Sequence, residues 1–209
     1  MRFNENNEVI LAGEIVSDFQ FSYEVLGEGF YLFDLKVSRN SGNFDVLPVI
    51  VSERVVNVKE SAIGATVKVE GQLRSYNKHI ENRSHVILTM FTQKIENLEE
   101  GKEYKNRVKL RGFICKQPTY RQTPLGRDIS DFTIAVNRPY GKSDYIPCIA
   151  WSRNAVFLSM QDVGTEIEIE GRFQSREYKK RIGEEEFEIR TAFEVSVSNL
   201  EVVNDECEY

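Results

Sequence analysis

Aromatic and basic side chains gather in the second half of this chain, on the sides of the expected strands that face away from the core. Tyr145 and Trp151 fall opposite the apolar Cys148 and Ala150, because successive side chains of a strand point to opposite faces. Flat rings can stack on unpaired nucleic-acid bases while cations follow the phosphates, and each stacked base contributes about 1 to 3 kcal/mol. The sequence therefore predicts a surface for a single-stranded nucleic acid. The candidate contact residues are the aromatics Tyr140, Tyr145, Trp151 and Tyr178 and the cations Arg138, Arg153, Arg172, Arg176, Lys179, Lys180 and Arg181.

Each of these residues also has a plainer interpretation. A single outward tyrosine or tryptophan is often a rim residue of the core or an interface residue. The basic run 179–181 is also typical of a solvated hairpin tip, because the acidic run 184–186 that follows can neutralise its charge. The joint arrangement of four aromatics and several cations in one small module is what favours a binding surface.

The residues give little support for metal binding or catalysis. Cys115, Cys148 and Cys207 are too scattered for a zinc site or a disulfide framework, and His79 and His85 do not complete one. No Ser/His/Asp or Cys/His arrangement is visible, and the acidic run 184–186 is not an opposed pair of carboxylates. We expect a protein that is not an enzyme and that uses no metal and no cofactor.

The chain contains two copies of one module. A shift of 99 places aligns the first parts of the two copies at alternate positions. The later pairs need a slightly larger shift, because the second copy contains inserted residues. The repeat predicts a first domain at 1–101, a second at 106–203 and a short acidic tail at 204–209. Matching residues include Asn7 and Asn106, Val9 and Val108, Gly13 and Gly112, Arg39 and Arg138, Asp45 and Asp144, Gly71 and Gly171, and Ser75 and Ser175.

Within each copy the apolar residues alternate with period two, as in half-buried strands. In the second copy the alternation covers five strands, and a short helix is expected at 153–161, before Gly164. Five strands with a helix after the third are typical of an OB-fold barrel. We expect an all-β protein of two tandem five-stranded OB-fold barrels, each with one short helix between strands three and four. The expected inward residues of the last strand are Ile189, Thr191, Phe193, Val195 and Val197.

The formal charge of -6 is unevenly distributed. Residues 1–105 hold 12 lysines and arginines against 16 acidic residues, whereas residues 106–203 hold 15 against 14. The acidity thus lies mainly away from the candidate surface and does not exclude a polyanionic partner. No apolar run approaches the roughly 18 residues of a membrane span, and the start lacks a signal-peptide core. We expect a cytoplasmic, nucleoid-associated protein with no membrane partner.

Several segments of the second copy resemble the bacterial single-stranded DNA-binding proteins of the SSB family. The segments are 106–112, 132–138, 144–151, 170–173 and 193–197, and the first copy resembles the family more weakly. The resemblance implies an OB fold and sequence-tolerant binding of single-stranded DNA in replication, recombination or repair. Four base-stacking positions of the family fall on Tyr140, Tyr145, Trp151 and Tyr178. Because assemblies of this family have four barrels, two barrels per chain imply a homodimer.

The first copy departs from the family pattern, because its four corresponding positions carry no aromatic residue. Phe44 and Tyr76 lie nearby but out of register. We therefore expect the first barrel to be mainly structural or to hold a partner. The corresponding residues are Ser41, Val46, Ser52 and Lys78.

The ending at 204–209 also differs from the long acidic tail with which family members recruit replication and repair proteins. The resemblance therefore extends to DNA binding, whereas recruitment of replication or repair proteins lacks its usual acidic tail. An alternative function is an OB-fold protein-interaction module of a replication or primosomal assembly, with weak DNA binding.

Overall fold

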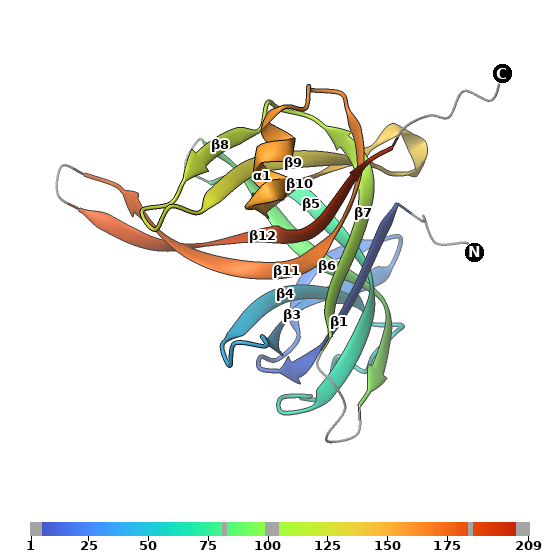
Figure 1. The fold of residues 1–209 in the computed structure, drawn as a ribbon. Helices are drawn as coiled ribbons and strands as arrows, with labels where there is room; N and C mark the ends of the chain where they lie inside the picture. The colour runs from blue at the N-terminus through green and yellow to red at the C-terminus, as the bar shows by residue number, and fades with distance from the viewer. Residues whose placement is uncertain (1–5, 81–82, 99–104, 184–185, 204–209) are drawn as a thin grey trace.

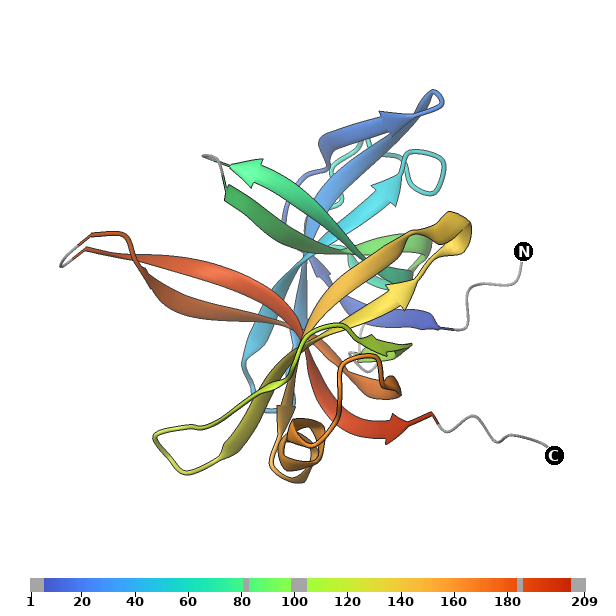
Figure 2. The same ribbon diagram turned by 90° about the horizontal axis from the view of Figure 1, so that it is seen from above.

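The computed structural model describes residues 6–80, 83–98, 105–183 and 186–203, and these form strands with one α-helix (Figures 1 and 2). The predicted tail at 204–209 lies outside the described residues. The first copy consists of β1 (Asn7–Ile15), β2 (Gln20–Val25), β3 (Glu28–Ser38), β4 (Phe44–Ser52), β5 (Thr66–Ile80) and β6 (Arg83–Asn97). The second copy consists of β7 (Asn106–Ile114), β8 (Thr119–Gln122), β9 (Asp128–Asn137), the 3-10 helix η1 (Pro139–Gly141), β10 (Ser143–Trp151), α1 (Arg153–Ser159), β11 (Glu166–Arg181) and β12 (Phe187–Val202).

Each copy closes into a barrel of five strands. In the first copy β1 pairs with β5 and with β3, and the ring is completed through β4 and β6, which run parallel to each other. The second copy repeats this order with β7, β11, β12, β10 and β9. Closure pairs the strand edges that an open sheet would expose. The prediction of two tandem OB-type barrels is confirmed.

Two details differ from the predicted barrels. Each copy has a further short strand, β2 or β8, which forms a hairpin with the strand that follows it. The helix is present in the second copy alone among the described residues, where Ala155 and Leu158 of α1 are buried. Residues 53–64 of the first copy form turns. This segment contains Val55 and Val56, and β-branched residues have a lower helix propensity than alanine or leucine.

The alternation of apolar residues correctly predicts the core of the second barrel but fails at its projecting end. Val195 and Val197 are buried as expected, whereas Ile189 is 65% exposed. The outer parts of β11 and β12 leave the barrel and extend together as a projecting hairpin (Figures 1 and 2). Ile189 lies on this hairpin, where no opposing sheet covers it.

Glycines at matching positions allow the strands of each barrel to cross closely. A Cβ atom on Gly13 would lie 2.2 Å from the carbonyl oxygen of Lys36, and one on Gly112 would lie 2.2 Å from that of Ala135. Both distances are far below van der Waals contact, so any side chain would force the strands apart. The repeated glycines are therefore part of barrel closure.

The two barrels are joined by antiparallel pairing of β1 with β7. Val9 pairs with Val108, its own counterpart in the repeat, and Asn7 pairs with Leu110 while Leu11 pairs with Asn106. This register makes the junction symmetric about the Val9–Val108 pair. The chain therefore contains, within itself, the kind of two-fold interface that usually joins two identical subunits.

Two asparagines fasten each first strand to the outer hairpin of its own barrel. The Asn7 amide donates to the Leu73 carbonyl (2.8 Å) and its oxygen accepts from the Leu73 N–H (2.9 Å). Asn106 makes the same two bonds with Phe173, at 2.7 and 2.8 Å. These bonds satisfy backbone groups of β5 and β11 just beyond the point where their pairing with β1 and β7 ends, which explains why asparagine occurs in both copies.

Two buried aspartates connect the barrels, and we call each aspartate with its arginine and serine partners a clamp. Asp45 accepts from Arg39 of its own barrel and from the backbone N–H of Ser175 in the other (2.8 Å). Asp144 likewise accepts from Arg138 and from the backbone N–H of Ser75 (2.6 Å). Both aspartate side chains are fully buried. An ionised buried carboxylate is tolerated only with such partners.

The Asp45 carboxylate is stabilised in its ionised form by its partners in the clamp. Burial acts to raise the pKa of Asp45, but the hydrogen bonds from Arg39 and Ser175 outweigh it and hold the pKa below its usual value. A lowered folded-state pKa contributes stability above the ordinary aspartate pKa, and this stability is lost as the pH falls through the folded-state value.

We expect Asp45→Asn to lower the free energy of unfolding at neutral pH by about 2–5 kcal/mol, because it leaves Arg39 without its charged partner. Urea unfolding measures the change. The difference from the unsubstituted protein should shrink as the pH falls below about 4. The control is Glu14→Gln, since the exposed Lys36–Glu14 pair (3.7 Å) should contribute less than about 1 kcal/mol. Equal effects of the two variants would contradict a role for the clamp.

Candidate nucleic-acid interface

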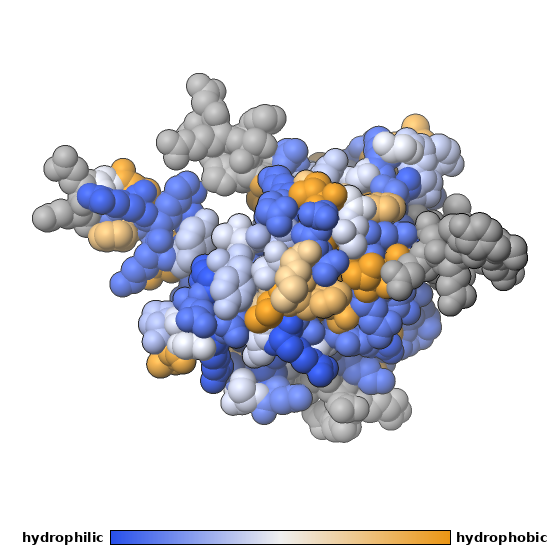
Figure 3. Space-filling model, turned by 45° about the horizontal axis from the view of Figure 1, so that its top comes forward, coloured by the Kyte–Doolittle hydropathy of each residue, from blue (hydrophilic) through white to orange (hydrophobic). Residues whose placement is uncertain are grey.

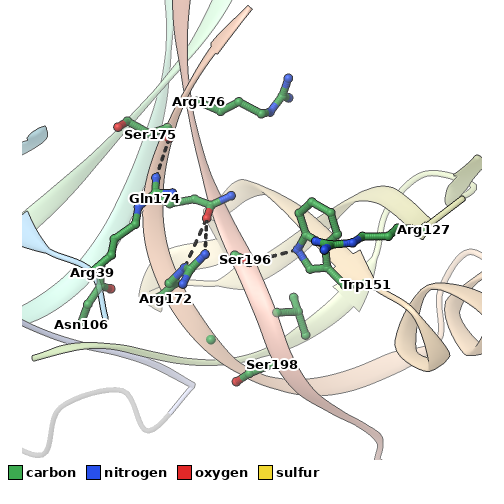
Figure 4. Close-up of a pocket in the computed structure, with 12 residues that line it drawn as sticks. Arg39, Asn106, Arg127, Trp151, Arg172, Gln174, Ser175, Arg176, Ser196 and Ser198 are labelled. Carbon is green, nitrogen blue, oxygen red and sulfur yellow. Dashed lines mark hydrogen bonds between the residues drawn. The ribbon is translucent and has the colours of Figure 1, made fainter. Parts of the chain in front are cut away.

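Trp151 lies at the end of β10, on the outer face of the second barrel. Its indole N–H donates to the Ser196 hydroxyl on β12 (3.1 Å), which fixes the ring, and the residue stays 36% exposed. The ring borders a pocket of about 660 Å³. Figure 4 shows Trp151 on one side of this pocket, with Arg172 and Gln174 of β11 on the other. A fixed, exposed ring in an open pocket offers one face to a planar ligand.

Four arginines line the Trp151 pocket, and two of them, Arg39 and Arg176, are paired with the carboxylates of Asp45 and Glu194. Arg172 and Arg176 were predicted from the sequence, whereas Arg39 and Arg127 were not. Arg127 precedes β9 in the turn of the β8–β9 hairpin, and Arg39 comes from the other barrel, where it belongs to the Asp45 clamp. The equivalence of Arg39 with Arg138 in the repeat was the available signal for Arg39. No local pattern distinguishes Arg127.

The two predicted arginines of β11 are held differently. Arg176 binds Glu194 through Nε and Nη2 at 3.1 Å, and the Glu194 side chain is only 6% exposed. These hydrogen bonds raise the pKa of Arg176 above its usual value, although burial opposes the rise. Arg172 contacts the Gln174 side-chain oxygen at 3.2 Å, and Gln174 in turn donates to Glu194. Arg172 therefore has the more available charge.

Tyr178 lies further along β11 and borders a second groove, of about 910 Å³. It is 38% exposed and pairs across the hairpin with Arg190, another cation that the sequence analysis missed. The opposite wall includes Val86 of β6, which belongs to the first barrel. In Figure 2 the β5–β6 hairpin and the projecting hairpin extend toward the same side of the molecule. Arg176 lines both this groove and the Trp151 pocket, and so connects them.

Tyr145 lies at the junction of the barrels, and neither it nor Tyr140 lines the Trp151 pocket. Tyr140 is fully exposed in η1 with a positive φ of 65°. Tyr145 is 51% exposed, and its backbone N–H donates to the Ser75 hydroxyl of the first barrel (2.7 Å). Tyr145 and Tyr76 line one pocket of about 330 Å³. Trp151, Tyr178 and Tyr145 thus border three different pockets, and Tyr140 borders none of the pockets described.

The remaining predicted cations lie elsewhere. Arg138 belongs to the Asp144 clamp, so its first role is structural. Arg153 begins α1 and does not line the pockets of Trp151 or Tyr178. The basic run 179–181 follows Tyr178 along the projecting hairpin, where Arg181 donates to the Gly183 carbonyl (2.9 Å).

The face of the molecule shown in Figure 3 is mainly hydrophilic. On the face shown in Figure 3, apolar side chains appear in small groups among hydrophilic ones, including along the projecting hairpin. No described helix is long and apolar enough to cross a membrane. Within the described part of the chain, no three histidine, cysteine or acidic side chains are placed to hold a metal ion. The side chains of His79 and His85 lie outside that part.

The fold and these pockets define a tandem OB-barrel protein with an open, aromatic and cationic outer face. Residues 105–203 match the model of the single-strand binding protein family. Single-stranded DNA-binding protein 2 of Listeria monocytogenes is 34% identical over 110 residues, which cover 49% of this chain and 68% of that protein. The chain belongs to the single-strand binding protein family, a family of binding proteins rather than enzymes.

Other relatives agree with this assignment. Single-stranded DNA-binding protein A of Bacillus subtilis is 35% identical over 106 residues, covering 47% of this chain and 61% of that protein. For the Oceanobacillus iheyensis relative the covered share of that protein is 53%, so the chain matches little more than half of several curated relatives.

Solved structures extend the similarity to both barrels. The wild-type single-stranded DNA binding protein from Thermus aquaticus superposes with a TM-score of 0.68 at 23% identity, over 95% of this chain and 93% of that one. A deletion mutant of the same protein gives a TM-score of 0.71 at 20% identity, over 96% and 95%. At this identity the similarity establishes the shared fold.

Arg176 is ion-paired with Glu194 whereas Arg172 contacts the neutral Gln174, and this difference leads to a prediction about stability. Arg176→Ala should lower the free energy of unfolding by about 1–3 kcal/mol, because it leaves the buried Glu194 without its charged partner. Arg172→Ala is the matched control on the same strand and should change it by less than about 0.5 kcal/mol. Urea unfolding measures both. Comparable losses for the two variants would show that Glu194 does not depend on Arg176.

Proposed function

We propose that this protein binds single-stranded DNA without strong sequence preference and without catalysis, through the outer face of its second barrel. The observation that carries the proposal is the exposed ring of Trp151, fixed by Ser196 and faced by arginines across an open pocket. Every base has a flat face that can stack on such a ring, so stacking tolerates any sequence. The guanidinium groups supply contacts for phosphates, which carry no sequence information.

The Trp151 pocket and the Tyr178 groove together favour an extended ligand over a compact one. Arg176 borders both, so a strand stacked on Trp151 can continue past Arg176 to Tyr178. The run 179–181 extends the positive charge along the projecting hairpin. In this proposal Trp151 and Tyr178 stack on bases, while Arg172, Arg176 and the basic run contact phosphates.

Assembly and biological partners belong to the same proposal. The family resemblance favours a homodimer with four barrels, acting in replication, recombination or repair. Light scattering of the free protein should then give twice the mass of one chain.

Fluorescence of Trp151, the single tryptophan of the chain, provides a direct test of DNA binding. Titration with a mixed-sequence single-stranded oligonucleotide should quench this fluorescence, because a stacked base contacts the indole. The apparent affinity should fall linearly with salt on a log–log plot, with a slope of about -0.7 per phosphate contacted. A duplex of the same sequence is the control and should bind more weakly. Negligible affinity for the single strand would favour the alternative protein-interaction module.

Substitution of the rings should identify the binding face. Trp151→Ala and Tyr178→Ala should each weaken binding by about 1–3 kcal/mol, the contribution of one stacked base. Phe157→Ala is the matched control, because Phe157 is 41% exposed on α1 but lines neither pocket. Fluorescence anisotropy of a labelled oligonucleotide measures all three variants without relying on Trp151. Unchanged affinity in both ring variants would place the DNA elsewhere.

A further inference from the structure

The first barrel carries an aromatic pocket of its own, of about 810 Å³, on the outer face that corresponds to the Trp151 pocket. Its lining comes mainly from β2, β5 and β6, with one residue of β4 and Arg138 of the second barrel, and includes Tyr23, Tyr76 and Phe91. The residue that corresponds to Trp151 in the repeat, Ser52, is buried and bound to Glu28. The first barrel therefore lacks a ring at the family position but supplies rings from other strands.

The rings of this pocket rest on half-buried phenylalanines and remain partly exposed themselves. Tyr23 stacks on Phe30 with a centroid distance of 4.9 Å and an interplanar angle of 20°, and Phe30 packs against Phe91 at 5.7 Å. Tyr23 remains 38% exposed and Tyr76 46% exposed. A ring that stacks on the protein through one face is held in place and keeps its other face for a ligand, which lowers the entropy lost on binding.

The pocket also has an excess of positive charge. Arg74 of β5 donates to Asp144 at 2.9 Å, and Arg138 binds the same carboxylate. Two guanidinium groups thus share one buried aspartate, and both line the pocket. In the other clamp, position 74 corresponds to the neutral Gln174, so Asp45 is paired with Arg39 alone among the salt bridges of the described residues. The uncompensated charge beside Tyr23 and Tyr76 suits a phosphate.

This first-barrel pocket continues into the junction pocket beside Tyr145. Ser75, Tyr76, Asn77 and Arg138 line both of them. Tyr76 of the first barrel and Tyr145 of the second therefore border one path. Lys142 lies along the same path.

We propose that single-stranded DNA bound to the second barrel crosses the junction at Tyr145 and Tyr76 and enters the first-barrel pocket, where Tyr23 and Tyr76 stack on bases. Arg74 and Arg138 face the phosphates there. The inference rests on the proposed function and extends it. It gives the first barrel a direct part in binding, where the sequence led us to expect a mainly structural role.

Photo-cross-linking of the full chain to a single-stranded oligonucleotide carrying 5-iodouracil in place of thymine tests the path. We expect cross-links at Tyr23 or Tyr76 as well as in residues 106–203, identified by mass spectrometry of the digested complex. Cross-links confined to residues 106–203 would overturn the first-barrel site and leave the proposed function intact. Failure of the unsubstituted protein to bind or cross-link would overturn both.

A variant pair gives an independent test by affinity. The double variant Tyr23→Leu and Tyr76→Leu keeps apolar bulk but removes the aromatic faces. Its affinity for a long oligo(dT) should fall at least about 30-fold, as expected for the loss of two stacked bases, while its affinity for the shortest oligo(dT) that quenches Trp151 should stay unchanged. Phe21→Leu is the control, because Phe21 is 62% exposed on the same strand β2 but packs against Tyr31 outside the pocket. Equal affinity of the double variant and the control for long oligo(dT) would contradict the proposal.

Discussion

The buried aspartates Asp45 and Asp144 are the constraint on which the arrangement of the two barrels depends. Each is fully buried and accepts from an arginine of its own barrel and from a backbone N–H of the other. A carboxylate without these partners would carry a large desolvation cost, so the barrels must meet in the one register that supplies them. The β1–β7 pairing, centred on Val9 and Val108, sets that same register through the backbone.

This constraint explains which polar residues the two copies share. Arginine, aspartate, serine and asparagine recur at the junction because each copy must present the same groups to the other across a two-fold relationship. The outer faces are under no such requirement. There the copies differ: the second has Trp151 among arginines, whereas the first has Tyr23, Tyr76 and Phe91 beside Arg74. The residues of the junction are therefore shared by the two copies, whereas those of the two outer faces differ.

The junction also brings the two faces into contact. The Ser75 hydroxyl accepts a hydrogen bond from the Tyr145 backbone N–H, and the Ser75 backbone N–H donates to Asp144. The same serine therefore positions Tyr145 and joins the barrels. Tyr76 follows it directly in the chain and faces Tyr145 across a common pocket. Arg39 links the Asp45 clamp to the Trp151 pocket in the same way. Structural and candidate binding residues are therefore neighbours, and variants must be chosen to separate the two roles.

The sequence by itself determined the repeat, the closed barrels and the inward-facing residues of most strands, because the two-residue period of a strand is a local property. It also indicated the exposure of Trp151, Tyr145 and Tyr178. It was wrong for Ile189, since a local period does not reveal where a hairpin leaves its barrel. It was also wrong about a helix in the first copy, where Val55 and Val56 lie in turns.

Only the tertiary structure decided which residues stand opposite one another. Arg138 was predicted as a contact residue and is bound to Asp144, while Arg39 and Arg127 reach the Trp151 pocket from distant segments. The placement of Tyr76 beside Tyr145 depends on strand pairing between barrels and on a hydrogen bond across 70 positions of the chain. Such contacts join residues that are far apart in the sequence. Local patterns do not encode the distances between these residues, because the distances are set by how the two barrels pack against each other.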